Sequence, residues 1–263
     1  MATSRGRLLK LGVLDLPALP GAANDPNLQG GLPLSEVLSL GQDERALALT
    51  PLTTEGAGLA LGTRQGVVKR VNPEVLSRDE WEVISLKEGD EVVGALELAT
   101  GDETLCFVTS GGQLLHFSAG GVRPQGRSGG GIAGIKLGAG DTVAWFGALE
   151  PQSSVLVTAS GSSTALPGTE AGSVKVTPFS EYPSKGRATG GVRCHRFLKG
   201  EDTLVFAWAG DVPARAAAAS GAPVDLPEAT GRRDGSGIPG SQPIAACAGP
   251  VAQRLDPASR VSG

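Results

Sequence analysis

The stretch "VTSGGQLLHF", residues 108–117, predicts a β-hairpin, and similar stretches return along the whole chain. In each of them a turn glycine separates two short segments, and an apolar residue stands five positions after that glycine. Glycine adopts a positive φ angle at little cost, which the tight turn of a hairpin requires. The other copies are "ATSRGRLLKL" (2–11), "GTRQGVVKRV" (62–71), "VTASGSSTALP" (157–167) and "AAASGAPVDLP" (217–227).

A second element recurs between these hairpins. It is clearest in "AGIKLGAGDTVAWFGAL" (133–149), and "EVISLKEGDEVVGALEL" (82–98) aligns with it at a shared Leu-x-x-Gly-Asp motif. Gly-Asp favours a tight turn and the flanking apolar residues favour strands, so the element predicts a second hairpin. Its other copies are "VLSLGQDERALAL" (37–49), "RFLKGEDTLVFAWA" (196–209) and "GIPGSQPIAACAG" (237–249).

The repeat predicts an all-β domain. Two hairpins make four strands, and a repeat of about 45–60 residues with four strands has the size of a propeller blade. We therefore expect a single domain over 1–255 and a flexible tail over 256–263. The five expected blades cover about 1–50, 51–98, 99–149, 150–209 and 210–255.

The chain begins just before the turn of its first hairpin. This start inside a repeat predicts a fragment of a longer protein, and "VAQRL" (251–255) is expected to supply the missing strand and close the ring. Three stretches, "LPLSEVLSL", "EVLSRDEWEVISL" and "PARAAAASG", also fit a helix. The repeat favours strands in all three, and a short helical turn over 74–80 remains an open alternative.

Composition limits the class of protein. Of 263 residues, 40% are hydrophobic and only 4% are aromatic, so we expect a core of Val, Leu, Ile and Ala. There is no apolar run of the length that crosses a membrane and no signal peptide. The three cysteines lie far apart without a C-x-x-C motif, which predicts neither disulfides nor a zinc site and fits a reducing cytoplasm.

The glycine-rich stretch 129–134 reads as G-x-G-x-x-G, which is a dinucleotide-binding motif. That motif needs a helix after its glycines, whereas Gly134, Gly138 and Gly140 interrupt the region. A flexible linker is also disfavoured, because the pattern returns in register. We therefore expect no nucleotide cofactor.

Other candidates for chemistry are weak. Tyr182 stands between glutamate and proline, unlike a DNA-cleaving tyrosine after an arginine, and reads as a loop residue. Cys194-His195 has no other spaced ligands for a metal, and the Gly-Asp pairs are explained by turns. No catalytic residue, metal site or cofactor is expected.

The glycine-rich pattern instead places arginines at matching points. "QGRSGGGI" (125–132) aligns with "KGRATGGV" (185–192) and "RRDGSGI" (232–238), so that Arg127, Arg187 and Arg233 coincide. A guanidinium amid exposed backbone N–H groups suits phosphates, which accept from both. The net charge of −4 argues against a nucleic-acid binder, but a local basic stripe matters more than the sum.

The motifs "TRQGVVKRV", "VTSGGQLLHF", "GRSGGGIAGIKLGAGD" and "SLKEGDEVV" together resemble a known family. It is the C-terminal β-pinwheel of the A subunit of bacterial type IIA topoisomerases, DNA gyrase and topoisomerase IV. The resemblance covers the chain in five repeats. It implies a five-bladed β-pinwheel, a propeller-like disc of four-stranded blades whose basic rim bends or wraps duplex DNA.

Gyrase domains of this family carry a box, Q-[KR]-R-G-G-[KR]-G, needed for wrapping. The nearest match here is 125–131, in which Gln125, Arg127, Gly129 and Gly131 agree and the remaining three positions differ. Five repeats and a degenerate box resemble topoisomerase IV more than gyrase.

The resemblance implies a non-catalytic domain that presents a DNA segment to the catalytic core of an ATP-dependent enzyme. Its implied partners are double-stranded DNA, the ATPase B subunit, and the rest of the A subunit. We expect a monomeric isolated domain in the cytoplasm, associated with the nucleoid. The candidate DNA contacts are Arg5, Arg7, Lys10, Arg64, Lys69, Arg70, Arg123, Arg127, Lys185, Arg187, Arg232 and Arg233.

Two other functions remain open. A protein-interaction propeller would show an apolar or acidic patch and no salt-sensitive affinity for DNA. An enzyme on a propeller would need polar groups converging in a central pocket, and the sequence offers few.

Overall fold

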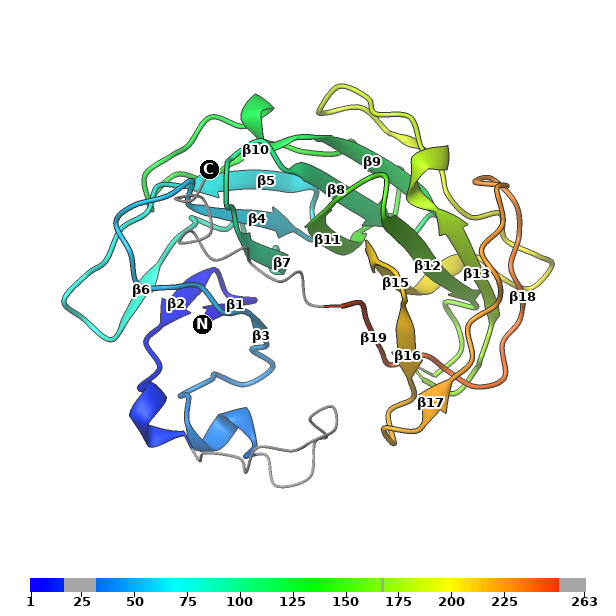
Figure 1. The fold of residues 1–263 in the computed structure, drawn as a ribbon, viewed down its shortest axis with the longest axis horizontal. Helices are drawn as coiled ribbons and strands as arrows, with labels where there is room; N and C mark the ends of the chain where they lie inside the picture. Colours follow the sequence, from blue (N-terminus) through cyan, green and yellow to red (C-terminus); the bar gives the residue numbers. More distant parts are fainter. Residues whose placement is uncertain (17–31, 167, 251–263) are drawn as a thin grey trace, which may run out of the picture. The chain divides into compact units, whose positions relative to one another are not determined.

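The computed structural model describes residues 1–16, 32–166 and 168–250. Within these residues the regular structure consists of β-strands and short 3-10 helices without any α-helix, which confirms the all-β class (Figure 1). The chain forms two compact units, 1–148 with 184–192, and 149–183 with the chain from 193 onward. The 3-10 helices are η1 (Val13–Asp15), η2 (Leu34–Glu36), η3 (Ala119–Gly121) and η4 (Phe179–Glu181).

Five antiparallel sheets, named here A to E, follow one another along the chain, and A to C belong mainly to the first unit. Sheet A has the order β3 (Ala46–Ala48), β1 (Ala2–Thr3), β2 (Arg7–Leu9), β6 (Glu80–Glu82). Sheet B has the order β10 (Ile132–Ala133), β5 (Val67–Val71), β4 (Leu59–Thr63), β7 (Val92–Glu97). Sheet C has the order β11 (Val143–Leu149), β8 (Thr104–Thr109), β9 (Gln113–Ser118), β14 (Val192–Arg193).

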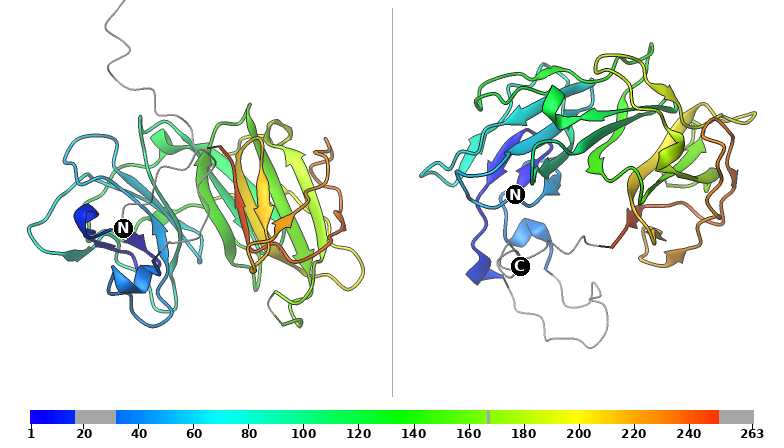
Figure 2. Two further views of the ribbon diagram at one scale, coloured as in Figure 1. Left: turned by 60° about the horizontal axis from the view of Figure 1, so that its bottom comes forward. Right: turned by 45° about the horizontal axis from the view of Figure 1, so that its top comes forward.

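Sheets D and E belong to the second unit, and the long strands β12, β13 and β15 of sheet D lie side by side (Figure 2). Sheet D has the order β15 (Thr203–Asp211), β12 (Ser154–Gly161), β13 (Ser173–Pro178), β18 (Ile238–Pro239). Sheet E has three strands in the order β17 (Pro223–Val224), β16 (Arg215–Ala217), β19 (Ala246–Ala248).

The predicted turn glycines make the central hairpins of the sheets. Gly6, Gly66 and Gly112 have φ angles of 71°, 82° and 71°, and each donates its N–H to the residue three positions earlier at 3.0 Å. A side chain is disfavoured at these angles, so the glycine pattern located the hairpins correctly.

The second predicted hairpin is wrong, because its two halves lie in different sheets. β6 follows the hairpin β4–β5 in the chain yet pairs with β2 in sheet A, whereas β7 joins sheet B. β10 is likewise contributed to sheet B from beyond the hairpin β8–β9. Each four-stranded sheet therefore receives its edge strand from the sequence that follows the next hairpin.

The segments that resemble helices form other structure. Leu34–Glu36 forms a single 3-10 turn, 72–79 contains no helix, and 215–217 is a strand of sheet E. The predicted closing strand 251–255 and the tail 256–263 lie outside the described residues. Among the described residues, no helix has the length and apolar character needed to span a membrane.

The cores consist mainly of aliphatic residues, as the composition predicts. In the first unit, Phe107 of β8 is fully buried and contacts two other rings. Its ring centroid lies 4.6 Å from that of Phe146 and 6.2 Å from that of Phe117. In the second unit, Val157, Val174 and neighbouring small residues form a separate core.

Candidate nucleic-acid interface

Three glycine-rich loops, 125–131, 185–191 and 232–237, occupy equivalent places beside the edges of their sheets. In each loop one carbonyl accepts an N–H from the segment that follows an edge strand. The three bonds are Ser85 N–H to Gly129 O at 3.2 Å, Lys136 N–H to Thr189 O at 3.0 Å and Arg196 N–H to Gly235 O at 3.0 Å. Arg127, Arg187 and Arg233 each precede that carbonyl by two residues, so the predicted register of these arginines is correct.

The matching residues of the box shape loop 125–131. Gln125 Oε1 accepts the N–H of Gly131 at 3.0 Å and ties the two ends of the loop together. Gly131 has a φ of 80°, and a Cβ there would lie 2.6 Å from Val67 Cγ1. Gly129 donates to Gly126 O at 3.1 Å and closes a turn. The side chain of Arg127 is 43% exposed and makes one long ion pair, 3.9 Å from Glu74.

Two predicted phosphate contacts point into the protein. Lys69 is 0% exposed and donates to three backbone carbonyls. Arg70 is half-buried and donates to the carbonyls of Ala57 and Gly101, both at 3.2 Å. We therefore correct the prediction for Lys69, which is not accessible to DNA. Arg70 holds neighbouring loops together.

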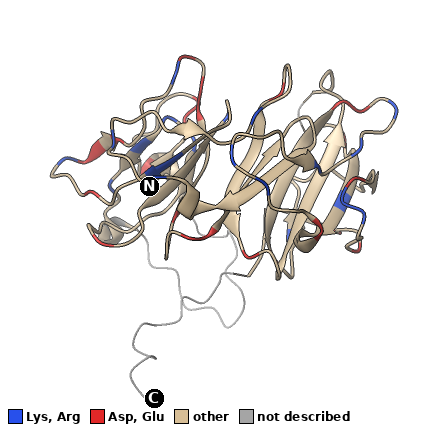
Figure 3. Ribbon diagram, turned by 90° about the horizontal axis from the view of Figure 1, so that it is seen from above, with Lys and Arg blue, Asp and Glu red and all other residues tan. Residues whose placement is uncertain are grey.

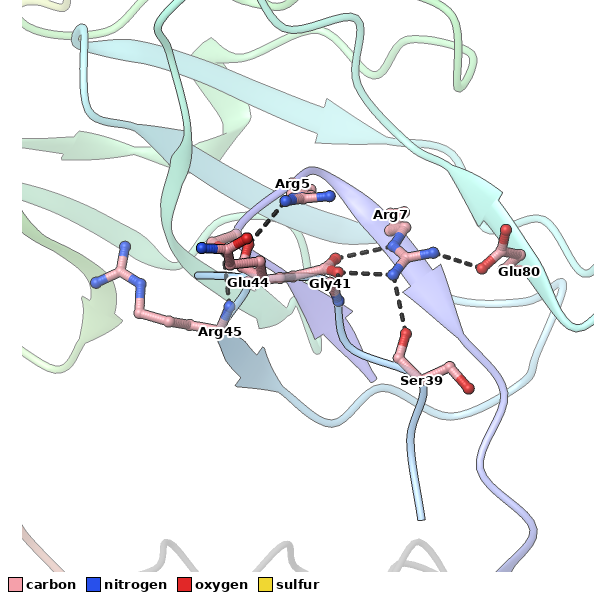
Figure 4. Close-up of polar contacts among 9 residues, drawn as sticks. Arg5, Arg7, Ser39, Gly41, Glu44, Arg45 and Glu80 are labelled. Atoms are coloured by element: carbon pink, nitrogen blue, oxygen red, sulfur yellow. Dashed lines mark hydrogen bonds and ion pairs between the residues drawn. The ribbon is translucent and has the colours of Figure 1, made fainter. Parts of the chain in front are cut away.

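Arg7 forms a network of ion pairs rather than a free basic surface (Figure 4). Its Nε and Nη2 contact the two oxygens of Glu44 at 2.8 and 2.6 Å, and its Nη1 contacts Glu80. The side chain of Glu44 is 0% exposed and also accepts the N–H of Gly41 at 2.8 Å. The hydrogen bond from Arg7 lowers the pKa of Glu44 to about 2, and the hydrogen bond to Glu44 raises the pKa of Arg7.

Glu44 is expected to make the protein sensitive to acid. Because its pKa is lower in the folded state than its ordinary value of 4.5, it stabilises the fold above pH 4.5, and this is lost as the pH falls towards 2. A shift of this size corresponds to about 3 kcal/mol. Denaturant unfolding between pH 6 and pH 2.5 should show a steeper loss for the native protein than for Glu44→Gln. Parallel curves would contradict this assignment.

A cleft of about 550 Å³ in the first unit brings several predicted residues together. It is lined by Arg5, Arg7, Arg78, Glu80, Trp81, Glu82 and Arg127. Arg78 was missed by the sequence reasoning, because it lies outside the repeated motifs in the irregular segment 72–79. It is exposed. Lys10 lies over the ring of Trp81, with Nζ 5.8 Å from the ring centroid.

The other predicted contacts are more dispersed. Arg64 is exposed and pairs with Glu91 at 3.1 Å, and Arg187 donates to Ala133 O at 2.6 Å. Lys185, Arg123 and Arg232 are exposed and Arg233 is partly exposed. Acidic residues lie between the basic ones in both units (Figure 3). The described residues thus carry local basic loops on an acidic protein.

The alternative reactive groups are buried. Burial raises the pKa of Cys194 to about 12 and lowers that of His195 to about 4, which suits neither a nucleophile nor a base. Tyr182 was predicted as a loop residue, but it is buried with its ring 5.7 Å from that of Phe179. The described part of the chain contains no cluster of His, Cys, Asp and Glu able to hold a metal ion.

The repeats match a known family. The sequence model described as "DNA gyrase C-terminal domain, beta-propeller" matches residues 82–98, 103–149 and 168–207. The chain belongs to this family. As a member of the gyrase C-terminal domain family, it is 32% identical over 195 residues to the DNA gyrase A protein of Escherichia coli (strain K12), covering 72% of this chain and 20% of that protein. It is also 32% identical over 197 residues to the DNA gyrase A protein of Staphylococcus epidermidis (strain ATCC 12228 / FDA PCI 1200), covering 73% and 20%.

Solved structures share the fold of this gyrase-family domain. The C-terminal domain of DNA topoisomerase IV superposes with a TM-score of 0.73, and the DNA gyrase A C-terminal domain with 0.64. Both alignments have 20% identity and cover 94% of this chain, with 77% and 80% of the other chains. The β-pinwheel class is thereby confirmed, whereas the preference for topoisomerase IV over gyrase stays a prediction. The chain spans about one fifth of the length of the curated relatives it matches.

Proposed function

We propose that the protein is a non-catalytic DNA-binding domain of a type IIA topoisomerase. It binds duplex DNA along the basic edges of its blades, bends or wraps it, and presents a segment to the catalytic core. The observation that carries this proposal is the equivalent placement of Arg127, Arg187 and Arg233 on three glycine-rich loops. An isolated surface arginine would have no reason to recur in register.

Phosphate contacts carry no sequence information, so the binding should have little sequence specificity. Bending a site of about 20–30 base pairs costs on the order of 1–6 kcal/mol, so several such contacts must act together. The partners are the ATPase B subunit of the enzyme, together with the remainder of its A subunit. With them the domain acts on chromosomal DNA in the cytoplasm.

The test is duplex affinity as a function of salt. Each phosphate contact releases counterions, so the logarithm of affinity falls with the logarithm of salt concentration. Arg127→Ala, Arg187→Ala and Arg233→Ala should each reduce this slope by about one unit. Fluorescence anisotropy with duplexes of unrelated sequence measures both the slope and the lack of specificity.

Arg45→Ala is the matched control. Arg45 is exposed and pairs with Glu91 at 3.2 Å, but it lies on no glycine-rich loop, so its removal should leave the salt slope unchanged. An affinity that does not depend on salt would contradict the proposal and favour a protein-interaction module instead.

A further inference from the structure

The buried ammonium of Lys69 holds one glycine-rich loop from inside. Its Nζ donates to the carbonyls of Val83 at 2.7 Å, Arg127 at 2.8 Å and Gly129 at 2.6 Å. Burial lowers the pKa of Lys69 to about 8, so most molecules carry the charge at neutral pH. Two of the three acceptors belong to loop 125–131, so a full positive charge lies directly beneath it.

The same arrangement occurs in the second unit. Lys175 is buried, and its Nζ donates to Arg232 O at 3.3 Å, Arg233 O at 2.6 Å and Gly235 O at 3.3 Å. Val68 pairs with Ile132 and Val174 pairs with Ile238, so the lysine that follows each valine occupies the same strand position. A buried lysine under a glycine-rich loop is thus a repeated device rather than one accident of packing.

Peptide geometry fixes what the lysine does to the loop. In a trans peptide the C=O of one residue and the N–H of the next point in opposite directions. Because the carbonyls of Arg127 and Gly129 point at Lys69, the N–H groups of Ser128 and Gly130 point away from it. Both residues lie at the surface, and neither N–H has a hydrogen-bond partner among the described residues.

The third loop shows the arrangement without a lysine. A Cβ on Gly191 would meet Leu114 O and Leu115 Cβ, just as a Cβ on Gly131 would meet Val68 O and Lys69 Cβ, so Leu115 replaces the lysine. In that loop Ala188, which is equivalent to Ser128, donates its N–H inward to Gly134 O at 2.6 Å. The outward N–H therefore accompanies the lysine, and the inward N–H accompanies the leucine.

We propose that Lys69 is a positioning residue that turns the N–H groups of Ser128 and Gly130 outward, and that these groups bind a DNA phosphate together with the Arg127 guanidinium. This inference rests on the proposed function and names the phosphate site within it. Oriented N–H groups and a guanidinium are both donors that phosphate oxygens accept. Lys175 orients the second loop in the same way, but Asp234 replaces Ser128 there and its carboxylate repels phosphate, so loop 125–131 is the stronger site.

The first experiment uses the unaltered protein and residue-resolved amide NMR. Titration with inorganic phosphate, and then with a short duplex, should shift the amide signals of Ser128 and Gly130. The signal of Ala188 should not shift, because its N–H is already bonded. Equal shifts at Ala188, or none at Ser128 and Gly130 although the duplex binds, would overturn the inference.

The second experiment removes the lysine. Lys69→Met should abolish the hydrogen-exchange protection of the Gly129 and Gly131 amides and leave that of Gly235 intact, and Lys175→Met should do the reverse. This readout needs no DNA, so it tests the loop separately from the proposed function. The natural Leu115 shows that an apolar side chain is accepted at this position. Unchanged protection at Gly129 would overturn the role of Lys69.

Duplex affinity then tests whether Lys69 acts through the loop. Lys69→Met should reduce the salt slope by about one unit or more in the native background. In an Arg127→Ala background its further effect should be smaller, whereas in an Arg233→Ala background it should be undiminished. Ser128→Ala keeps the N–H and should bind as the native protein does. Equal effects in both backgrounds, or a loss from Ser128→Ala as large as that from Lys69→Met, would overturn the proposal.

Discussion

Replacing Arg7 with methionine should lower the free energy of unfolding by about 3–5 kcal/mol. The side chain of Glu44 is 0% exposed, and it would keep only the Gly41 N–H in place of a two-pronged guanidinium. A buried carboxylate without its partner is among the most costly defects that one substitution creates. Urea unfolding at neutral pH measures the loss, and adding Glu44→Gln to the variant should recover part of it.

Arg64→Met is the control for this prediction. Arg64 also pairs with a glutamate, but its side chain is 51% exposed, so its pair with Glu91 should contribute less than about 1 kcal/mol. Equal losses for the two variants would show that burial of Glu44 is not what makes the Arg7 pair important.

Phe107→Ala should cost a similar amount, about 3–5 kcal/mol, because it opens a cavity in the core of the first unit. Phe107 is 0% exposed and is the ring that joins Phe117 and Phe146. With few aromatic residues in the chain, there is little nearby volume that could fill the space. Thermal or denaturant unfolding checks the value.

Val205→Ala is the matched truncation at the surface. Val205 is 53% exposed, so the loss should stay within about 0.5 kcal/mol. A loss from Phe107→Ala no larger than this would mean that the core of the first unit collapses around the missing ring.

The hairpins could be predicted from sequence because a local rule sets them. Gly6, Gly66 and Gly112 need positive φ angles, and such a requirement is written in the residue itself. The pairing of β6 with β2 and of β10 with β5 could not be predicted. These edge strands have only two or three residues, and the packing of sheets, rather than their own sequence, selects their partners.

The site was predicted in part for a similar reason. The register of Arg127, Arg187 and Arg233 follows from alignment of the loops and is correct. The inward direction of Lys69 had a signal that went unused. Successive residues of a strand face opposite sides, so Lys69 and Arg70 in "VVKRV" could not both face solvent on one side of the sheet.

The passing of edge strands from one sheet to its predecessor sets the order in which the protein can fold during synthesis. Sheet A cannot be completed until the ribosome has released residue 82, and sheet B must wait for residue 133. Sheet D waits in the same way for residue 239. Each nascent sheet therefore keeps one open border until the next hairpin has emerged, so translation rate and chaperone access govern the yield of correctly assembled protein.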